Sequence, residues 1–436
     1  MKCKVFKRLR LMIVFLMLYV TYNFVSVTTK LMVVRPSVNT EGANDNAQTY
    51  TTRKIYGIPE FPVFSVIAVN SSAGKEWDIF AVNAWINQTA AKDVQFCCYL
   101  MGGGKIITLR SLRINQRIEM FNLTAQVECP NPSTILKKRS SHSHLVGLTI
   151  SRTGVCISGN DFVKPYYPLK QTNKFSFAIC GKLIYGDINI PLTLEWMEYN
   201  RYMGVSKVVL YEYNISSEVS KILKYYQSTG FVDVIPFSLP SYADTVAHRP
   251  GMKTVQAWND EQILVYDCQS RLRGYKYVGV IDMDEFIVPV TDRNFENMLG
   301  RLIYVLPNMA AAEVYGEMFI LDWKKTNKAG KLIIEQYENR TVSKAPIDIN
   351  QRKLIHLPSR VQRGSVVTHG CKALNSTYAI FKDPLSVMSI NHYRKCVYFR
   401  DDCFTRAQVT DKRISRFLKK VEIAVHKTKQ ILNMPI

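Results

Sequence analysis

The chain has 436 residues, of which 47% are hydrophobic and 11% aromatic, and it carries a formal net charge of +22. This composition excludes a disordered or low-complexity chain, and the length suits one large domain with extensions. Lys and Arg are spread along the whole chain, without a basic run interleaved with aromatics. We therefore expect an anionic small substrate or membrane surface as partner, and no nucleic acid.

The N-terminal residues have the pattern of a membrane anchor. Residues 1–10 carry five basic residues and no acid, and residues 11–27 are almost wholly apolar. This pattern predicts a cytoplasmic tail (1–10) and a transmembrane signal-anchor (11–27), with the rest of the chain lumenal. A cleaved signal peptide is the alternative, although no clear small-x-small site follows the apolar segment. The polar residues 28–54 are predicted to form a lumenal stem.

Glycosylation motifs and cysteines agree with a lumenal body. Of ten cysteines, Cys3 falls on the cytoplasmic side, so nine remain and at least one lacks an intramolecular partner. Six Asn-x-Ser/Thr motifs are typical of a protein of the secretory pathway. They begin at Asn70, Asn87, Asn122, Asn214, Asn339 and Asn375.

A β-rich accessory region is predicted over residues 55–174. Apolar and β-branched runs predict strands at 63–69, 94–100 and 105–109. The three glycines at 102–104 indicate a turn and not a phosphate loop, because no Lys-Ser/Thr follows at Walker spacing.

Residues 175–436 are predicted to form an α/β domain, because strands and helices alternate there. This order is typical of a mainly parallel sheet with helices on both faces. We expect an amphipathic helix over 190–203, ended by Gly204, and a C-terminal helix over 405–434 with a solvated basic face. The other elements are strands at 175–180, 207–213, 231–235 and 277–281, and helices at 219–229 and 260–271.

Three carboxylates, Asp282, Asp284 and Glu285, directly follow the apolar strand predicted at 277–281. Buried charge is costly without a partner, and the carboxyl end of a strand in an α/β sheet is a common ligand site. In extended backbone Asp282 and Asp284 point to the same side, where two oxygen donors can hold a hard divalent cation. A strand end capped by solvated acids is the alternative.

Four motifs stand in order through the middle of the chain. They are Leu194-Glu-Trp-Met-Glu-Tyr-Asn-Arg-Tyr-Met-Gly-Val205, Val208-Val-Leu-Tyr211, Gln262-Ile-Leu-Val-Tyr-Asp-Cys268 and Tyr277-Val-Gly-Val-Ile-Asp-Met-Asp-Glu-Phe-Ile-Val-Pro289. With these motifs the chain resembles glycosyltransferase family 92 over roughly residues 95–400.

The resemblance implies a GT-A-like fold, a nucleotide-sugar donor, Mn²⁺ and inversion at the anomeric carbon. The implied reaction moves galactose from UDP-galactose to an N-glycan or another glycoconjugate, in β-1,4 linkage. A single-pass type II protein of the Golgi membrane, with its catalytic domain in the lumen, is the implied setting.

Carried onto this chain, the resemblance makes Asp282 and Asp284 the Asp-x-Asp acids that bind metal and UDP. Asp284 is expected to contact the metal most directly, Asp282 to lie nearer the ribose or the metal's waters, and Glu285 to orient both. A third metal ligand is expected late in the chain, at His369 or His392, with His369 preferred. A hydrogen-bonded histidine of the core or a loop is the alternative for each.

Other roles concern phosphate and the acceptor. Arg394 is expected to contact phosphate. Inversion needs a general base, for which Glu317 is preferred over Glu313 and Asp322, with a surface acid as the alternative for each. A transferase for another UDP-sugar, or a non-catalytic membrane-anchored glycan-binding protein, remains the competing hypothesis.

Overall fold

The computed structural model describes residues 61–70, 77–86, 95–119, 122–135, 145–156, 162–169, 171–238, 261–342, 352–382, 387–396 and 403–435. All of them belong to one compact unit, residues 50–436. The predicted tail, anchor and stem lie outside the described residues. Within the described ranges, no helix is both long and apolar enough to cross a membrane.

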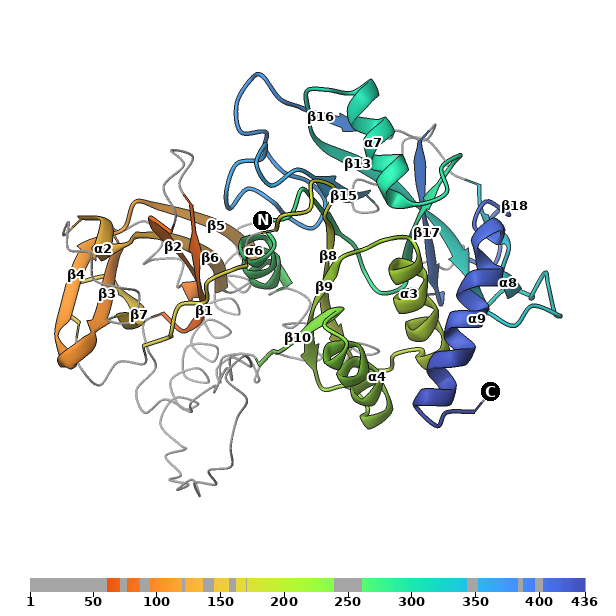
Figure 1. The fold of residues 1–436 in the computed structure, drawn as a ribbon, viewed down its shortest axis with the longest axis horizontal. Coiled ribbons are helices and arrows are strands. Elements are labelled where there is room, and N and C mark those ends of the chain that lie inside the picture. The colour runs from red at the N-terminus through yellow and green to blue at the C-terminus, as the bar shows by residue number, and fades with distance from the viewer. Residues whose placement is uncertain are drawn as a thin grey trace, which may run out of the picture. The chain divides into compact units, whose positions relative to one another are not determined.

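The N-terminal strands form two antiparallel sheets (Figure 1). Their bounds are β1 (Val63–Val69), β2 (Ile79–Ile86), β3 (Phe96–Met101), β4 (Ile106–Arg110), β5 (Arg113–Glu119), β6 (Asn122–Pro130) and β7 (Leu145–Ser151). One sheet has the order β1-β2-β6-β5 and the other β4-β3-β7. The glycines at 102–104 form a short 3₁₀ turn between β3 and β4, with Gly103 at a positive φ of 81°, and the short helix α2 (Pro132–Ile135) follows β6. The three strands predicted here are present as β1, β3 and β4.

A larger mixed sheet follows. Its strands are β8 (Phe177–Tyr185), β9 (Lys207–Tyr213), β10 (Val232–Pro236), β11 (Tyr277–Val280), β12 (Glu285–Pro289), β13 (Met309–Ile320), β14 (Asn339–Thr341), β15 (Arg352–His356), β16 (Ala379–Lys382), β17 (Met388–Arg394) and β18 (Gln408–Thr410). The main path runs β10-β9-β8-β11-β15-β13-β14-β18, while β16 and β17 pair with β13, and β12 pairs with β17.

The expectation of a mainly parallel sheet holds only for one part of it. β10, β9, β8 and β11 are parallel, but β15 runs antiparallel to both β11 and β13. Strand direction depends on how the intervening chain crosses the sheet and not on the strand's own residues. The architecture is therefore α/β with a mixed sheet.

Helices cover both faces of this sheet. They are α3 (Ile190–Tyr202), α4 (Ser217–Ser228), α6 (Glu261–Arg271), α7 (Phe295–Val305), α8 (Ile333–Gln336) and α9 (Ser415–Ile431). α3 and α9 lie side by side, whereas α6 packs between β8 and the N-terminal strands β1, β2 and β6 (Figure 1).

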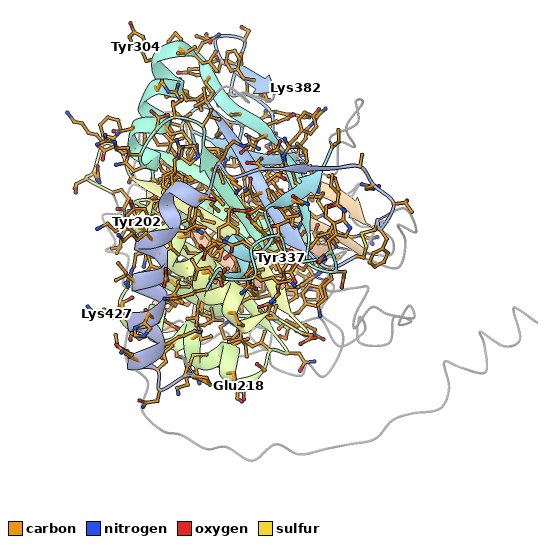
Figure 2. The ribbon with its side chains drawn as sticks, turned by 90° about the vertical axis from the view of Figure 1, so that its right-hand side faces the viewer. Tyr202, Glu218, Tyr304, Tyr337, Lys382 and Lys427 are labelled. Atoms are coloured by element: carbon orange, nitrogen blue, oxygen red, sulfur yellow. A yellow bond between two sulfur atoms is a disulfide. The ribbon has the colours of Figure 1, made fainter. Side chains whose placement is uncertain are left out.

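Two helix predictions need correction. Residues 192–200 of α3 are all buried, so α3 is not amphipathic, because α9 covers the side that a surface helix would expose. The C-terminal helix begins at Ser415, ten residues later than predicted, and β18 occupies part of the difference. The predicted stop of α3 at Gly204 is confirmed, with φ of 94°. α9 does present a basic outer face, on which Lys427 points away from the sheet (Figure 2).

Four disulfides fasten the described residues. The pairs are Cys97–Cys129, Cys98–Cys156, Cys180–Cys268 and Cys396–Cys403. Cys371 is the free cysteine in the described part of the chain, which agrees with the odd number of cysteines predicted to be lumenal.

Candidate active site and its charge network

The acidic motif lies where the strand order of the large sheet reverses. β9 and β10 extend the sheet on one side of β8, and β11 lies on the other side. Ile281 N donates to Cys180 O at 3.2 Å, so Asp282 begins where the pairing of β8 with β11 ends. In open α/β sheets, ligands bind outside the carboxyl ends of the strands at such a reversal.

Asp282 is held between two buried lysines. Its Oδ1 lies 2.8 Å from Lys182 Nζ and its Oδ2 lies 2.6 Å from Lys353 Nζ. Burial opposes ionisation of Asp282, but the two ammonium groups outweigh burial and keep the pKa of Asp282 well below its usual range. Both oxygens of Asp282 are therefore occupied by protein cations.

Lys182 reaches this position from an irregular point in β8. The register with β9 shifts between Cys180 and Leu183, and Lys182 has a positive φ of 57°. Leu210 packs closely over Gly181 beside it, and a Cβ at this position would lie 2.3 Å from Leu210 Cδ2 and require that side chain to move. The bulge thus turns a lysine of a buried strand toward the acids.

The network continues through two glutamates. Lys182 Nζ also lies 3.0 Å from Glu261 Oε1, at the start of α6. Lys353 Nζ lies 3.0 Å from Glu285 Oε1, and Glu285 Oε2 accepts from Asp282 N at 2.9 Å. Burial alone would lower the pKa of Lys353, but Asp282 and Glu285 raise it above its ordinary value, so the lysine stays charged.

Asp284 faces a different partner, His392. Glu285 and His392 are opposite each other in the β12–β17 pair, which brings His392 Nε2 to 3.1 Å from Asp284 Oδ2 and His392 Nδ1 to 3.2 Å from Glu285 Oε1. Burial opposes ionisation of Asp284, but His392 outweighs it and lowers the pKa of Asp284.

Asp284 and His392 fit a hard divalent cation. Together with Glu285 they offer ligand atoms that all lie within 4.8 Å of one another. Two neighbouring ligands of an octahedral ion, each about 2.1 Å from it, are about 3.0 Å apart. The 3.1 Å between Asp284 Oδ2 and His392 Nε2 matches that spacing. Glu285, on the other ring nitrogen, would fix the orientation of the imidazole.

Comparison with known proteins places this chain in a family. The family model described as "Glycosyltransferase family 92" matches residues 175–435. The chain belongs to glycosyltransferase family 92. Its acidic motif, His392, Lys182 and Lys353 all lie within the matched region.

Two curated relatives carry galactosyltransferase names. The chain is 23% identical over 235 residues to "Beta-1,4-galactosyltransferase galt-1" of Caenorhabditis elegans, covering 52% of this chain and 50% of that protein. It is 30% identical over 132 residues to "Galactan beta-1,4-galactosyltransferase GALS3" of Arabidopsis thaliana, covering 29% of this chain and 24% of that protein. The chain thus spans half or less of the relatives that it matches.

Solved structures resemble this family 92 chain only distantly. Glucosyl-3-phosphoglycerate synthase from Mycobacterium tuberculosis has a TM-score of 0.23 at 8% identity, covering 60% of this chain and 81% of that chain. HddC from Yersinia pseudotuberculosis has a TM-score of 0.25 at 11% identity, covering 58% and 100%. These scores are too low to support a comparison of sites.

The structure brings Arg394 and His392, rather than His369, to Asp284 of the family 92 motif. Arg394 lies two residues beyond His392 on β17, and its charge helps to lower the pKa of Asp284. His369 Nδ1 lies 2.6 Å from the carbonyl oxygen of Arg352, and burial lowers the pKa of His369 to about 4. This neutral histidine is near the lysine side of the network and is not part of the Asp284 group.

Glu317 lies on the other face of the sheet. In the β13–β17 pair, Met318 is opposite His392 and Glu317 is opposite Asn391. Neighbouring side chains of a strand point to opposite faces. Glu317 instead contacts Arg413 and Arg340. The structure therefore does not bring the predicted base to the acids.

The two other carboxylates considered for the base are also placed. Glu313 pairs with Arg352 at 3.0 Å. Asp322 follows the end of β13 and accepts from the backbone N–H of Cys396. Of the three, Asp322 lies closest in the fold to the strand end that carries Arg394, because Leu321 N donates to Arg394 O at 3.0 Å.

Sequence reasoning missed Lys182, Lys353 and Glu261. Lys182 stands in an otherwise apolar strand, which is the signal that could have identified it, because a buried lysine requires an anionic partner. Lys353 lies in a strand that also contains Arg352 and His356, so its strand gives no such signal. Their convergence on Asp282 depends on the bulge in β8 and on the antiparallel entry of β15. Neither feature can be read from the local pattern.

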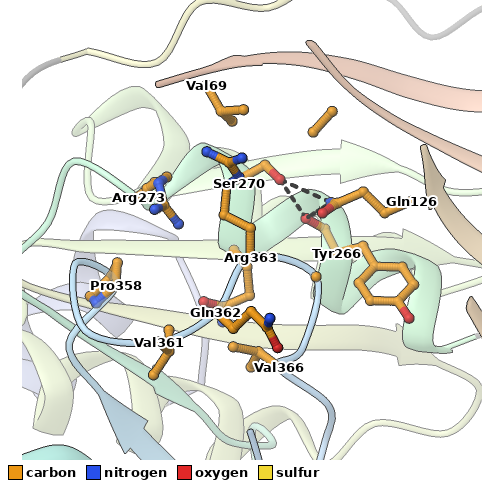
Figure 3. A pocket seen from close by; sticks show the side chains of 13 residues that line it. Val69, Gln126, Tyr266, Ser270, Arg273, Pro358, Val361, Gln362, Arg363 and Val366 are labelled. Atoms are coloured by element: carbon orange, nitrogen blue, oxygen red, sulfur yellow. Dashed lines mark hydrogen bonds between the residues drawn. The ribbon is translucent and has the colours of Figure 1, made fainter. Parts of the chain in front are cut away.

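The helix that carries Glu261 also contacts the N-terminal sheet of this family 92 chain. Gln126 of β6 donates to Ser270 Oγ at 3.2 Å and to Tyr266 O at 3.3 Å (Figure 3). A cavity of about 20 Å³ beside these groups has room for about one water molecule. The disulfide Cys180–Cys268 ties the same helix to β8. α6 thus joins the charge network to both sheets.

Proposed function

We propose that the protein is an inverting, metal-dependent glycosyltransferase that moves galactose from UDP-galactose to a glycan, in β-1,4 linkage, on a glycoprotein or another glycoconjugate. The observation that carries the proposal is the pairing of Asp284 with His392 beside the lysine-bound Asp282, at the reversal of strand order. Family membership supports glycosyl transfer, and the printed names of the two relatives support galactose.

A GT-A-like nucleotide-sugar site is supported by the position of the motif. Asp282 and Lys182 lie beside each other at the reversal point, outside the carboxyl ends of the four parallel strands, where α/β folds bind ligands. The fixed positive charges of Lys182, Lys353 and Arg394 suit an anionic diphosphate at this place.

Mn²⁺ is the proposed cofactor. Asp284 and His392 would hold it, and Glu285 would keep His392 oriented. When bound there, the ion would neutralise charge on the diphosphate and on the UDP leaving group. Asp282, with both oxygens on lysines, would keep those lysines in position and act on the ion through them or through water.

The proposed reaction is a single displacement. The acceptor hydroxyl oxygen forms a bond to the anomeric carbon while the bond from that carbon to the diphosphate oxygen breaks, and UDP leaves with the electron pair. The hydroxyl proton passes to a carboxylate of the protein. Asp322 is better placed for that role than Glu317, since Glu317 lies on the opposite face between two arginines.

We place the protein in the Golgi membrane as a type II protein with a lumenal catalytic domain. The basic and apolar N-terminal residues, the six glycosylation motifs and four disulfides support an oxidising lumenal compartment. Sugar nucleotides would be available to the site there.

A donor screen tests the proposal. Purified full-length protein in detergent is incubated with Mn²⁺, desialylated N-glycans and each of several UDP-sugars, and products are read by mass spectrometry. We expect transfer of one hexose from UDP-galactose, abolished by EDTA and restored by Mn²⁺. If transfer occurs only from another UDP-sugar, that UDP-sugar takes the place of UDP-galactose in the proposal. Glycan binding without transfer from any donor would instead indicate a non-catalytic glycan-binding protein.

A further inference from the structure

A hollow of about 560 Å³ lies beyond the ends of β13 and β17, outside the charge network. Its lining combines aromatic rings with side chains that can hydrogen bond. The residues that matter here are Asp322, Trp323, Thr326, Asn339, Phe404 and Gln408. Lys324 and Lys325 also line the hollow and add positive charge to it.

The hollow lies farther along the same strands than the candidate metal ligand His392, which is opposite Met318, four residues before Asp322. His392 and Arg394 are opposite Met318 and Ile320 in the β13–β17 pair, so these four side chains share one face. Two residues along a strand span about 7 Å, and the hollow starts two residues after Ile320, at Asp322.

Trp323 shows that the hollow lies on that same face. Its ring packs with Met318 and Ile320, which are the side chains opposite His392 and Arg394. A molecule seated against Trp323 would therefore lie beyond the end of β17 that carries Arg394, on the same face as His392.

The aromatic wall is held rigidly. Trp323 is buried and donates from Nε1 to Cys403 O at 3.1 Å, and Cys403 is cross-linked to Cys396. Phe404, directly after this cross-link, is nevertheless 64% exposed. The segment that supports Phe404 is buried and cross-linked, while the Phe404 ring itself is open to solvent. Little conformational entropy would therefore be lost when a ligand binds to this ring.

The opposite wall is polar. Asn339 Nδ2 donates to Gln408 Oε1 at 3.0 Å, across the β14–β18 pair. The Asp322 carboxylate is anchored by the N–H of Cys396. The Thr326 hydroxyl also belongs to this lining, and the volume of the hollow is large enough for a sugar ring.

We infer that this hollow binds a pyranose ring of the acceptor glycan and presents its hydroxyl toward the Asp284–His392 side. A pyranose has an apolar C–H face, which suits Phe404, and a rim of hydroxyls, which suits the amide and carboxylate wall. The inference rests on the proposed glycosyl transfer, and it adds the place where the acceptor enters.

A glycan attached to the protein itself is the other carbohydrate that the experiment must distinguish from the acceptor. Asn339 begins the Asn339-Arg-Thr341 motif and lines the hollow, so a glycan attached to Asn339 would occupy the same space. The amide of Asn339 is already engaged with Gln408, which favours a free acceptor as the occupant.

The test compares Phe404→Ala with Tyr304→Ala. Tyr304 is an equally open aromatic, 87% exposed on α7, and points away from the protein (Figure 2). Loss of one stacking ring is expected to raise the acceptor KM about tenfold, without changing the KM for UDP-galactose. Tyr304→Ala should leave both constants unchanged. An unchanged acceptor KM in Phe404→Ala, or an equal change in both KM values, overturns the inference.

Two further arms complete the test. The first arm measures direct binding of the desialylated glycan, without donor, to full-length wild type and Phe404→Ala. It tests the hollow even if no transfer is found, and equal binding by the two proteins overturns the inference. Thr341→Val removes the glycosylation motif while leaving Asn339 in place. A glycan found on Asn339 by peptide mass, with an unchanged acceptor KM in Thr341→Val, assigns the hollow to the protein's own glycan and overturns the inference. An unmodified Asn339 supports it.

Discussion

The two aspartates of the motif are two residues apart and similarly exposed, at 32% for Asp282 and 37% for Asp284. Their surroundings differ in the source of positive charge. Asp282 has both oxygens on lysines that the fold supplies permanently. Asp284 has one oxygen on a histidine and the remainder of its carboxylate available. The comparison teaches that one acid completes a fixed internal network, while its neighbour shares its charge with a single histidine, which is the arrangement on which the proposed cation site rests.

Removing the charge of Asp284 should have the largest effect. For Asp284→Asn we expect kcat/KM to fall at least about a thousandfold and metal-dependent UDP binding to disappear, because the proposed cation loses its carboxylate ligand. Transfer rates and UDP calorimetry with and without Mn²⁺ measure this. Asp292→Asn is the matched control, since Asp292 pairs with Arg301 and not with the network. Retention of full activity by Asp284→Asn would remove the metal assignment.

The Asp282→Asn variant should show that Asp282 and Asp284 have different roles. We expect the Mn²⁺ affinity to change less than about tenfold, while thermal stability falls, because two buried lysines lose their shared anionic partner. The lowered pKa of Asp282 means that its pairing stabilises the fold above about pH 4 and is lost as the pH falls through the folded-state pKa. The variant should lack that part of the acid sensitivity. If Asp282→Asn loses Mn²⁺ binding as completely as Asp284→Asn, the two aspartates have the same role.

Glu317→Gln should have the smallest effect on activity. Because Glu317 pairs with Arg413 and Arg340 on the opposite face, we expect kcat within about threefold of wild type and a melting temperature a few degrees lower. A hundredfold loss of kcat with an unchanged melting temperature would return Glu317 to the role of general base.

The sequence could predict the elements and the acids, because both depend on local pattern. The strand before Asp282 and the helices around it follow from short apolar runs. The choice of His392 over His369 could not be predicted, since it depends on the register of β12 against β17. The face of Glu317 was equally hidden, because β13 is buried along nearly its whole length and shows no alternation.

Helix α6 has a consequence for where this chain can be divided. The family match begins at residue 175, but Ser65 and Asn83 of the N-terminal sheet lower the pKa of the buried Asp267 of α6 against the effect of burial, and Phe64 and Trp85 belong to the same hydrophobic cluster as α6. A fragment cut at the edge of the family match would open that cluster to water and leave a buried carboxylate without these two residues. We therefore expect the smallest fragment that folds on its own to be larger than the family match at residues 175–435 and to include the first strands of the N-terminal sheet.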